Sequence, residues 1–225
     1  MGKNVPSDDF RSRRSPLEAK EKGLDVMTGL WKVISQLDAP HLLELMVARI
    51  VEAKGIFDPC RTLPCALSAI HKNHKIDADS QFFRLWEFSA ASLLEKSEHP
   101  PEPPKDWRQA VNLNCKCLDC TELKKFALDP QAQVYRFRAP QDRRSHLINI
   151  IREHRLDMAH ETDEKGRPYT LVCKKTRATY NMLCSEHQND VKGMQILITI
   201  LDQVSIKRES RFNDLQLRLT GAIQR

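Results

Sequence analysis

Three closely spaced cysteines are the part of this sequence with the clearest chemical meaning. Cys115, Cys117 and Cys120 form a Cys-x-Cys-x-x-Cys pattern in a chain of 225 residues. Thiolates at this spacing can all reach one ion, and soft sulfur ligands suit tetrahedral Zn²⁺ in a reduced compartment. Three ligands do not close a structural site, so a fourth must come from another segment. The pattern therefore predicts a zinc site that is completed from elsewhere in the chain.

A histidine is the expected fourth ligand. His146 is the first candidate, because it lies early on the next predicted helix, where a cysteine knuckle can pack against it. His154, His160 and Cys173 are the reserve candidates. His146 and His154 share one helical face, so a helix that directs one toward the metal directs the other the same way.

The cysteine pattern leaves two other interpretations open. The three thiols can be ordinary buried side chains, or the last two can be a redox pair, although no strand is predicted before them, as that motif requires. A looser set, Cys60 and Cys65 followed by His71 and His74, could also bind a metal. Core packing is favoured for this second set, because Cys65 falls on the apolar face of a predicted helix.

A basic stretch follows the cysteine pattern. Arginine recognises phosphates and carboxylates, and the interleaved Tyr135 and Phe137 could stack on bases. The candidate contacts with nucleic acid or another anion are Arg136, Arg138, Arg143, Arg144 and Arg152. The alternative is a solvated helix face beside one strand with alternate residues buried. Residues 107–225 carry 21 Lys and Arg against 14 Asp and Glu, a net charge of +7, whereas residues 24–106 carry 9 against 12, a net charge of −3.

Motifs of common enzyme classes are missing from the sequence. None of the 7 glycines forms Gly-x-Gly, which excludes phosphate-binding loops of the dinucleotide and Walker types. There is also no His-Glu-x-x-His, no Gly-x-Ser-x-Gly and no His-x-Asp of a facial triad. Whether the chain is an enzyme stays open, but these observations favour a binding protein.

The expected location of the chain is intracellular, in the cytoplasm or the nucleus. Seven cysteines without an apolar leader argue for reduced thiols rather than disulfides. No run approaches the ~18 to 20 apolar residues that cross a bilayer. We therefore expect no membrane partner.

Changes in composition predict five segments along the chain. They are a disordered basic tail (1–23), a helical bundle (24–98), a Pro-rich linker (99–106), a zinc-binding module (107–205) and a short frayed helix (206–225). Four prolines within residues 100–104 favour an extended spacer, which is why the boundary is placed there.

Apolar periodicity predicts a mainly helical α+β fold. Helices are expected at residues 24–37, 41–54, 63–74 and 79–98 in the bundle. In the module, a short helix is expected after Cys120 to about residue 128, and longer ones near 140–155 and 176–204. One β-hairpin is expected to pair residues 156–162 with 168–174. The heptad stripe of the 176–204 helix fits packing within its own domain, or a homo-oligomer surface.

Part of the chain resembles an uncharacterised cysteine-containing region of fungal proteins. The resemblance rests on residues 115–120 (CKCLDC), 143–147 (RRSHL) and 166–176 (GRPYTLVCKKT). Some proteins with similar segments are labelled as oxygenase-like and dependent on Fe(II) and 2-oxoglutarate. The resemblance implies that the three cysteines and His146 act as a set, and that the chain is an accessory region of such a protein.

Together these observations predict a non-enzymatic interaction module with a structural zinc at Cys115, Cys117, Cys120 and His146. The expected partner is a protein or a nucleic acid. Sequence-nonspecific nucleic-acid binding through residues 136–155 is the alternative function, beside the oxygenase accessory role.

Overall fold

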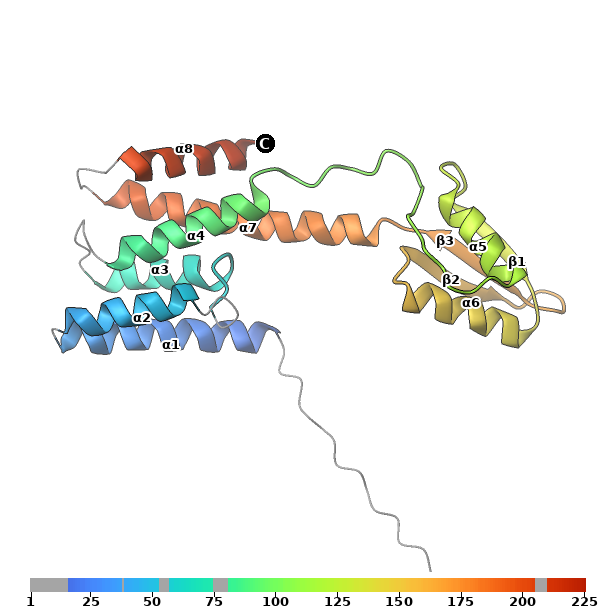
Figure 1. Cartoon of the computed structure of the whole chain (residues 1–225), viewed down its shortest axis with the longest axis horizontal. Helices are drawn as coiled ribbons and strands as arrows, with labels where there is room; N and C mark the ends of the chain where they lie inside the picture. Colours follow the sequence, from blue (N-terminus) through green and yellow to red (C-terminus); the bar gives the residue numbers. More distant parts are fainter. Residues whose placement is uncertain (1–15, 38, 53–56, 75–80, 205–209) are drawn as a thin grey trace, which may run out of the picture. The chain divides into compact units, whose positions relative to one another are not determined.

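The structure is a computed structural model that describes residues 16–37, 39–52, 57–74, 81–204 and 210–225. The chain divides into two compact units (Figure 1). The first unit takes residues 1–100 and 187–225, and the second takes residues 101–186. The fold is α+β and predominantly helical, as the sequence predicts.

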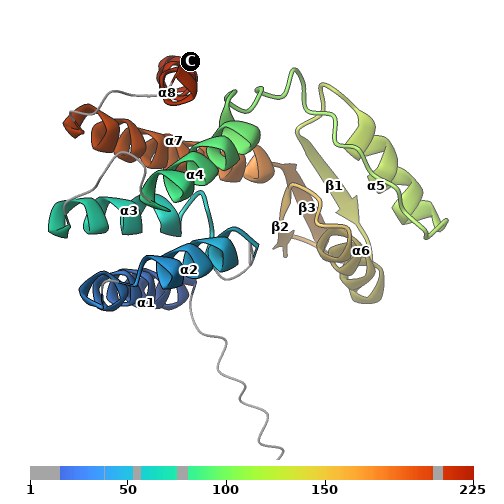
Figure 2. The same cartoon turned by 60° about the vertical axis from the view of Figure 1, so that its left-hand side comes forward.

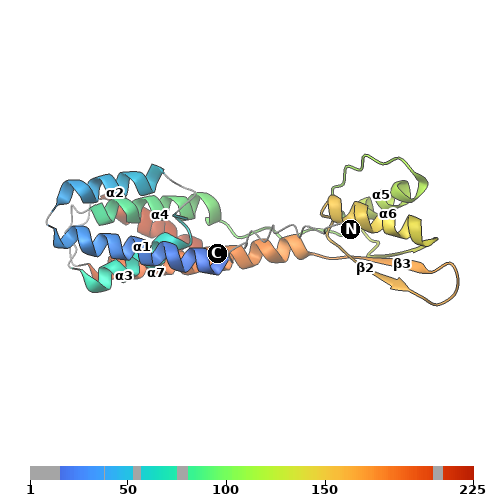
Figure 3. The ribbon, with the colours of Figure 1, turned by 90° about the horizontal axis from the view of Figure 1, so that it is seen from below.

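The first unit is entirely helical in its described part. Its helices are α1 (Pro16–Gln36), α2 (Pro40–Glu52), α3 (Thr62–Asn73), α4 (Gln81–Ser97), the second half of α7 (Ala178–Gln203) and α8 (Ser210–Gln224). Helices α1 and α2 run side by side, as Figures 1 and 3 both show. Apolar side chains at three- and four-residue spacing turn one face of each helix toward a shared core.

Helix α7 joins this core more deeply than its sequence indicates. Met194, Leu197 and Leu201 are buried there, and the Trp86 indole donates a hydrogen bond of 3.0 Å to the carbonyl oxygen of Leu197. The Asp190 carboxylate, also buried, accepts a hydrogen bond of 2.6 Å from the Ser97 hydroxyl on α4. The second unit thus ends at Glu186, within α7, whereas the sequence predicts an end at residue 205.

The second unit packs two helices against a small sheet. Its elements are α5 (Leu118–Leu128), β1 (Val134–Arg138), α6 (Gln141–Glu153), β2 (Met158–Asp163), β3 (Thr170–Lys175) and the start of α7. The strands are antiparallel in the order β1-β3-β2, and α5 and α6 lie on the same side of the sheet (Figure 2). The expected hairpin is present as β2 and β3, and β1 adds a third strand to it.

Alternation along the strands gives the sheet one covered and one open face. Phe137, Leu171 and Cys173 are buried against the helices. Their neighbours in sequence, Arg136 and Lys174, are exposed on the other face. This period of two fixes the register, in which Arg136 pairs with Val172 and Phe137 pairs with Leu171.

The first and the last predicted segments differ from the structure or lie partly outside its described residues. Helix α1 begins at Pro16, inside the predicted tail, and residues 1–15 lie outside the described residues. The last helix, α8, places Phe212 and Leu219 in the core of the first unit instead of fraying. The linker at 99–106 carries neither helix nor strand. Among the described helices, none combines the length and the apolar character that spanning a membrane requires.

Candidate metal centre

Cys115, Cys117, Cys120 and His146 come together in the second unit as a group that can hold a metal ion. Their ligand atoms all lie within 4.8 Å of one another. The cysteines come from the end of an extended segment and the first turn of α5, and the histidine comes from the second turn of α6. Among the described residues, this is the one such group of His, Cys, Asp and Glu.

The distances within the group fit a tetrahedral ion. The His146 Nε2 atom lies 3.5 Å from the Sγ atom of Cys115, 3.6 Å from that of Cys117 and 3.2 Å from that of Cys120. Zn–S bonds of about 2.3 Å and Zn–N bonds of about 2.0–2.1 Å, at the tetrahedral angle, place each sulfur about 3.6 Å from the nitrogen. The ligands thus stand close to a coordinating arrangement.

The start of α5 gives two of the cysteine thiols different pKa values. Cys117 is the N-cap, and its sulfur accepts a hydrogen bond of 3.4 Å from the backbone N–H of Cys120. This bond lowers the pKa of Cys117 to about 7, because it stabilises the thiolate. Burial raises the pKa of Cys120 to about 12. A buried thiol of this kind is held as a thiolate when a cation lies beside it.

An ion pair fixes α5 against α6 next to the cluster. Arg143, three residues before His146, binds both carboxylate oxygens of Asp119, at 2.7 Å and 2.5 Å. This bidentate contact lowers the pKa of the Asp119 carboxyl group. Asp119 is not among the site residues predicted from the sequence, although its position inside the cysteine motif could have indicated a role beside the cluster. Arg143 therefore helps to position the histidine ligand.

The reserve ligands lie outside the cluster. His154 is the C-cap of α6, eight residues beyond His146 and thus about 12 Å farther along the helix axis. His160 is exposed on β2, where it pairs in register with Cys173. Cys173 is buried in the core of the second unit. Spacing on one helical face was not enough to bring His154 near, because the two side chains lie about two turns apart.

The looser set in the first unit does not form a described metal group. Cys60 is buried in the apolar core, and its backbone carbonyl lies next to Gly193 of α7. Burial raises the pKa of the Cys60 thiol to about 11. Cys65, His71 and His74 are half-buried and do not converge with it.

One of the arginines predicted to contact a nucleic acid is buried within the second unit. Arg144 is only 4% exposed, so it is not available to a nucleic acid. Its guanidinium donates to the carbonyl of Ala139, to the hydroxyl of Thr162 and to the side-chain oxygen of Gln141. It also lies over the Tyr169 ring. Predicting Arg144 as a surface contact was therefore wrong, because a buried guanidinium must satisfy its donors within the protein.

The remaining arginines present a mixed surface. Arg136 forms an ion pair with Asp163 on the open face of the sheet. Arg138 is exposed and donates a hydrogen bond of 3.0 Å to the carbonyl oxygen of Arg167. Arg152 is exposed near the end of α6. Asp163 neutralises Arg136 and Asp119 neutralises Arg143, so this part of the chain is less basic than the number of its arginines indicates.

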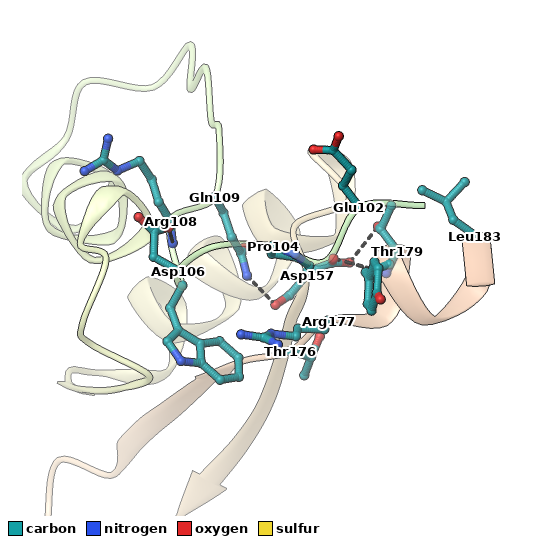
Figure 4. A pocket seen from close by; sticks show the side chains of 12 residues that line it. Glu102, Pro104, Asp106, Arg108, Gln109, Asp157, Thr176, Arg177, Thr179 and Leu183 are labelled. Carbon is teal, nitrogen blue, oxygen red and sulfur yellow. Dashed lines mark hydrogen bonds between the residues drawn. The ribbon is translucent and has the colours of Figure 1, made fainter. Parts of the chain in front are cut away.

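A pocket of about 260 Å³ lies elsewhere on the second unit (Figure 4). The guanidinium of Arg177 stacks 4.6 Å from the centre of the Trp107 ring. The Asp157 carboxylate accepts hydrogen bonds from the backbone N–H and the hydroxyl of Thr179, in the first turn of α7. Within the described residues, the Arg177 Nε atom and the Gln109 Oε1 atom are buried without a hydrogen-bond partner.

The fold and the cluster define a class: a predominantly helical α+β protein with a candidate Cys₃His metal centre. Comparison of the chain with protein-family models, with curated proteins and with solved structures finds no match. The chemistry of the site is therefore the feature of this chain that points to a function.

Proposed function

We propose that the chain is a non-enzymatic interaction module whose second unit is held together by a structural zinc ion. The observation that carries this proposal is the convergence of three sulfurs and one imidazole nitrogen within 4.8 Å. Thiolate and imidazole ligands in a tetrahedral set favour zinc over calcium, magnesium or manganese.

The composition of the ligand set supports a structural role. Four protein ligands fill a tetrahedral ion, whereas a catalytic zinc keeps a position open for water or substrate. The oxygenase type of iron site uses two histidines and one carboxylate, and the cluster offers one histidine and no carboxylate. The accessory role in an oxygenase-like protein, which the fungal resemblance implies, stays an alternative in which this cluster does no chemistry.

A protein partner is favoured over a nucleic acid by the arrangement of the arginines. Arg143 and Arg144 are engaged inside the unit, and Arg136 is paired with an acidic residue. A phosphate backbone needs several free cations along one path. The pocket beside Trp107 instead offers an aromatic wall, and aromatic side chains are enriched where a protein binds a segment of a partner protein.

Elemental mass spectrometry on the reduced, tag-free chain tests the metal. We expect about one zinc per chain, and its loss in the double variant Cys117→Ser with Cys120→Ser. The matched control is Cys65→Ser with Cys184→Ser, which also removes two thiols but leaves the cluster intact. Full zinc in the first double variant, or no metal in the wild type, contradicts the proposal. Iron in place of zinc would contradict the assignment of a structural zinc.

Titration with duplex DNA at two salt concentrations tests the choice of partner. Our proposal predicts weak binding that Arg152→Ala leaves nearly unchanged. Tight binding that falls steeply with salt, and that Arg152→Ala or Arg138→Ala weakens, would instead support the nucleic-acid function.

A further inference from the structure

Exposed apolar side chains gather on the first two helices of the first unit. Twelve large hydrophobic residues are exposed in the described part of the chain, and six of them fall within residues 26–45. They are Val26, Leu30, Val33 and Leu37 along α1 and the turn directly after it, and Leu42 and Leu45 on α2. Their exposed fractions lie between 38% and 63%. Such a concentration of apolar surface is typical of an interaction site.

The four residues along α1 form a regular seam. Their spacing of four, three and four residues is the heptad spacing by which one helix packs along another. A second apolar face on the same helix, which includes Met27 and Trp31, is already buried in the core. Helix α1 therefore carries two apolar faces, and only one of them is covered within the chain.

The surroundings of the seam permit close approach by a second helix. The positions that flank it on one side are Gly29 and Gln36, and on the other side Met27 and Ile34, so none of them is charged. A Cβ atom added at Gly29 would meet nothing within 4 Å. Glycine in an exposed helix interior costs about 1 kcal/mol relative to alanine, yet it leaves room for a side chain of a facing helix.

We propose that this seam is the interface of a homodimer, in which the α1–α2 surface of one copy packs against the same surface of a second copy. Uncharged flanks allow a surface to face itself without repulsion, and a heptad seam is complementary to its own copy. Six Val and Leu side chains at these exposures offer about 500 Å² per copy, so a pair buries roughly 1,000 Å², the lower limit of a specific interface.

The proposed dimer surface thus lies on α1, whereas the sequence predicts an oligomer surface on the 176–204 helix. The heptad stripe of α7 is not free, because Met194 and Leu201 are buried in the first unit and the other members are half-buried. The apolar residues of α7 that are exposed, Met182 and Leu183, lie side by side in sequence and form no heptad stripe.

Sedimentation velocity of the full, zinc-loaded chain over a hundredfold range of concentration tests the proposal. We expect a monomer–dimer equilibrium. The double variant Leu30→Glu with Val33→Glu should raise the dissociation constant of the dimer at least a hundredfold. The matched control, Met182→Glu with Leu217→Glu, makes the same charge change at two exposed apolar positions outside the seam and should leave the equilibrium unchanged.

Circular dichroism decides whether the seam variant is folded. If its helicity falls, Val26→Thr with Val33→Thr replaces it, because threonine matches valine in shape and exchanges one methyl group for a hydroxyl. We then expect at least a tenfold weaker dimer. A wild type that stays monomeric throughout the range overturns the proposal. So does a dimer that the folded seam variant leaves intact, or that the control weakens equally.

Discussion

The two units of this chain reach a stable fold by different means. In the described residues of the first unit, 24 buried apolar side chains form the core. Among them, the rings of Trp86 and Phe82 meet other rings edge to face. The core of the second unit contains 11 such side chains. Because apolar burial is the main favourable contribution to folding, the smaller core leaves less stability to offset the loss of chain entropy.

The second unit also places polar and charged groups inside or beside its core. Besides the cysteine and histidine cluster, Lys175 is buried, donates to the carbonyl oxygen of Asp129 and lies 4.8 Å from the centre of the Phe126 ring. Burial lowers the pKa of Lys175, so the unit accommodates this cation at a cost. If the cluster holds the proposed structural zinc, the comparison predicts that the second unit depends on this metal and the first does not.

Loss of one metal ligand should have the largest effect. Cys120→Ser should remove more stabilisation than a small unit possesses, since structural zinc binding is worth about 10–16 kcal/mol in zinc-finger peptides. Thermal unfolding followed by circular dichroism should show the transition of the second unit lost and that of the first retained. Cys65→Ser is the control, and an unchanged melting profile for Cys120→Ser would remove the difference between the units.

The ion pair beside the cluster should have a smaller effect. Asp119→Asn keeps the size of the side chain but breaks the charged contact with Arg143 that orients α6. Groups that support metal ligands typically change metal affinity 10- to 100-fold, so we expect zinc affinity to fall by about 1.4–2.7 kcal/mol. Competition with a chromophoric chelator measures this change. Glu122→Gln on the exposed face of α5 is the control and should bind zinc as tightly as the wild type.

Alkaline pH should weaken the first unit through a buried thiol. The pKa of Cys60 is raised from 9.0 to about 11 by burial, so the unfolded chain loses this proton first. The stabilisation is complete below pH 9 and falls, by about 2 kcal/mol, as the pH rises to 11. Urea unfolding at a series of pH values measures the slope. The slope should shrink in Cys60→Ala, and an equal slope in that variant would show that other groups cause it.

The smallest predicted effect concerns α1. Gly29→Ala should stabilise the first unit by about 1 kcal/mol through helix propensity, because the added Cβ meets no neighbour. Urea unfolding measured at low protein concentration isolates this gain from association. Gly193→Ala provides the contrast: its Cβ would lie 3.1 Å from the Cys60 carbonyl oxygen, so that substitution should destabilise the unit.

Features that depend on short segments were predicted better from the sequence than features that depend on contacts between distant segments. The ligand candidates and most helices followed from spacing and periodicity, which are properties of short segments. The heptad stripe of α7 showed an apolar face but not which core would bury it, so the boundary at Glu186 could not be placed. Likewise, the pairing of β1 with β3 and the burial of Arg144 depend on partners distant in sequence.

Hydrogen–deuterium exchange of the full chain, with zinc and after its removal by a chelator, tests the central claim most directly. The account predicts that removal abolishes protection in β1, β3 and α6 of the second unit, while α4 and the second half of α7 in the first unit stay protected. Protection that is unchanged in the second unit, or lost equally in both units, would contradict it.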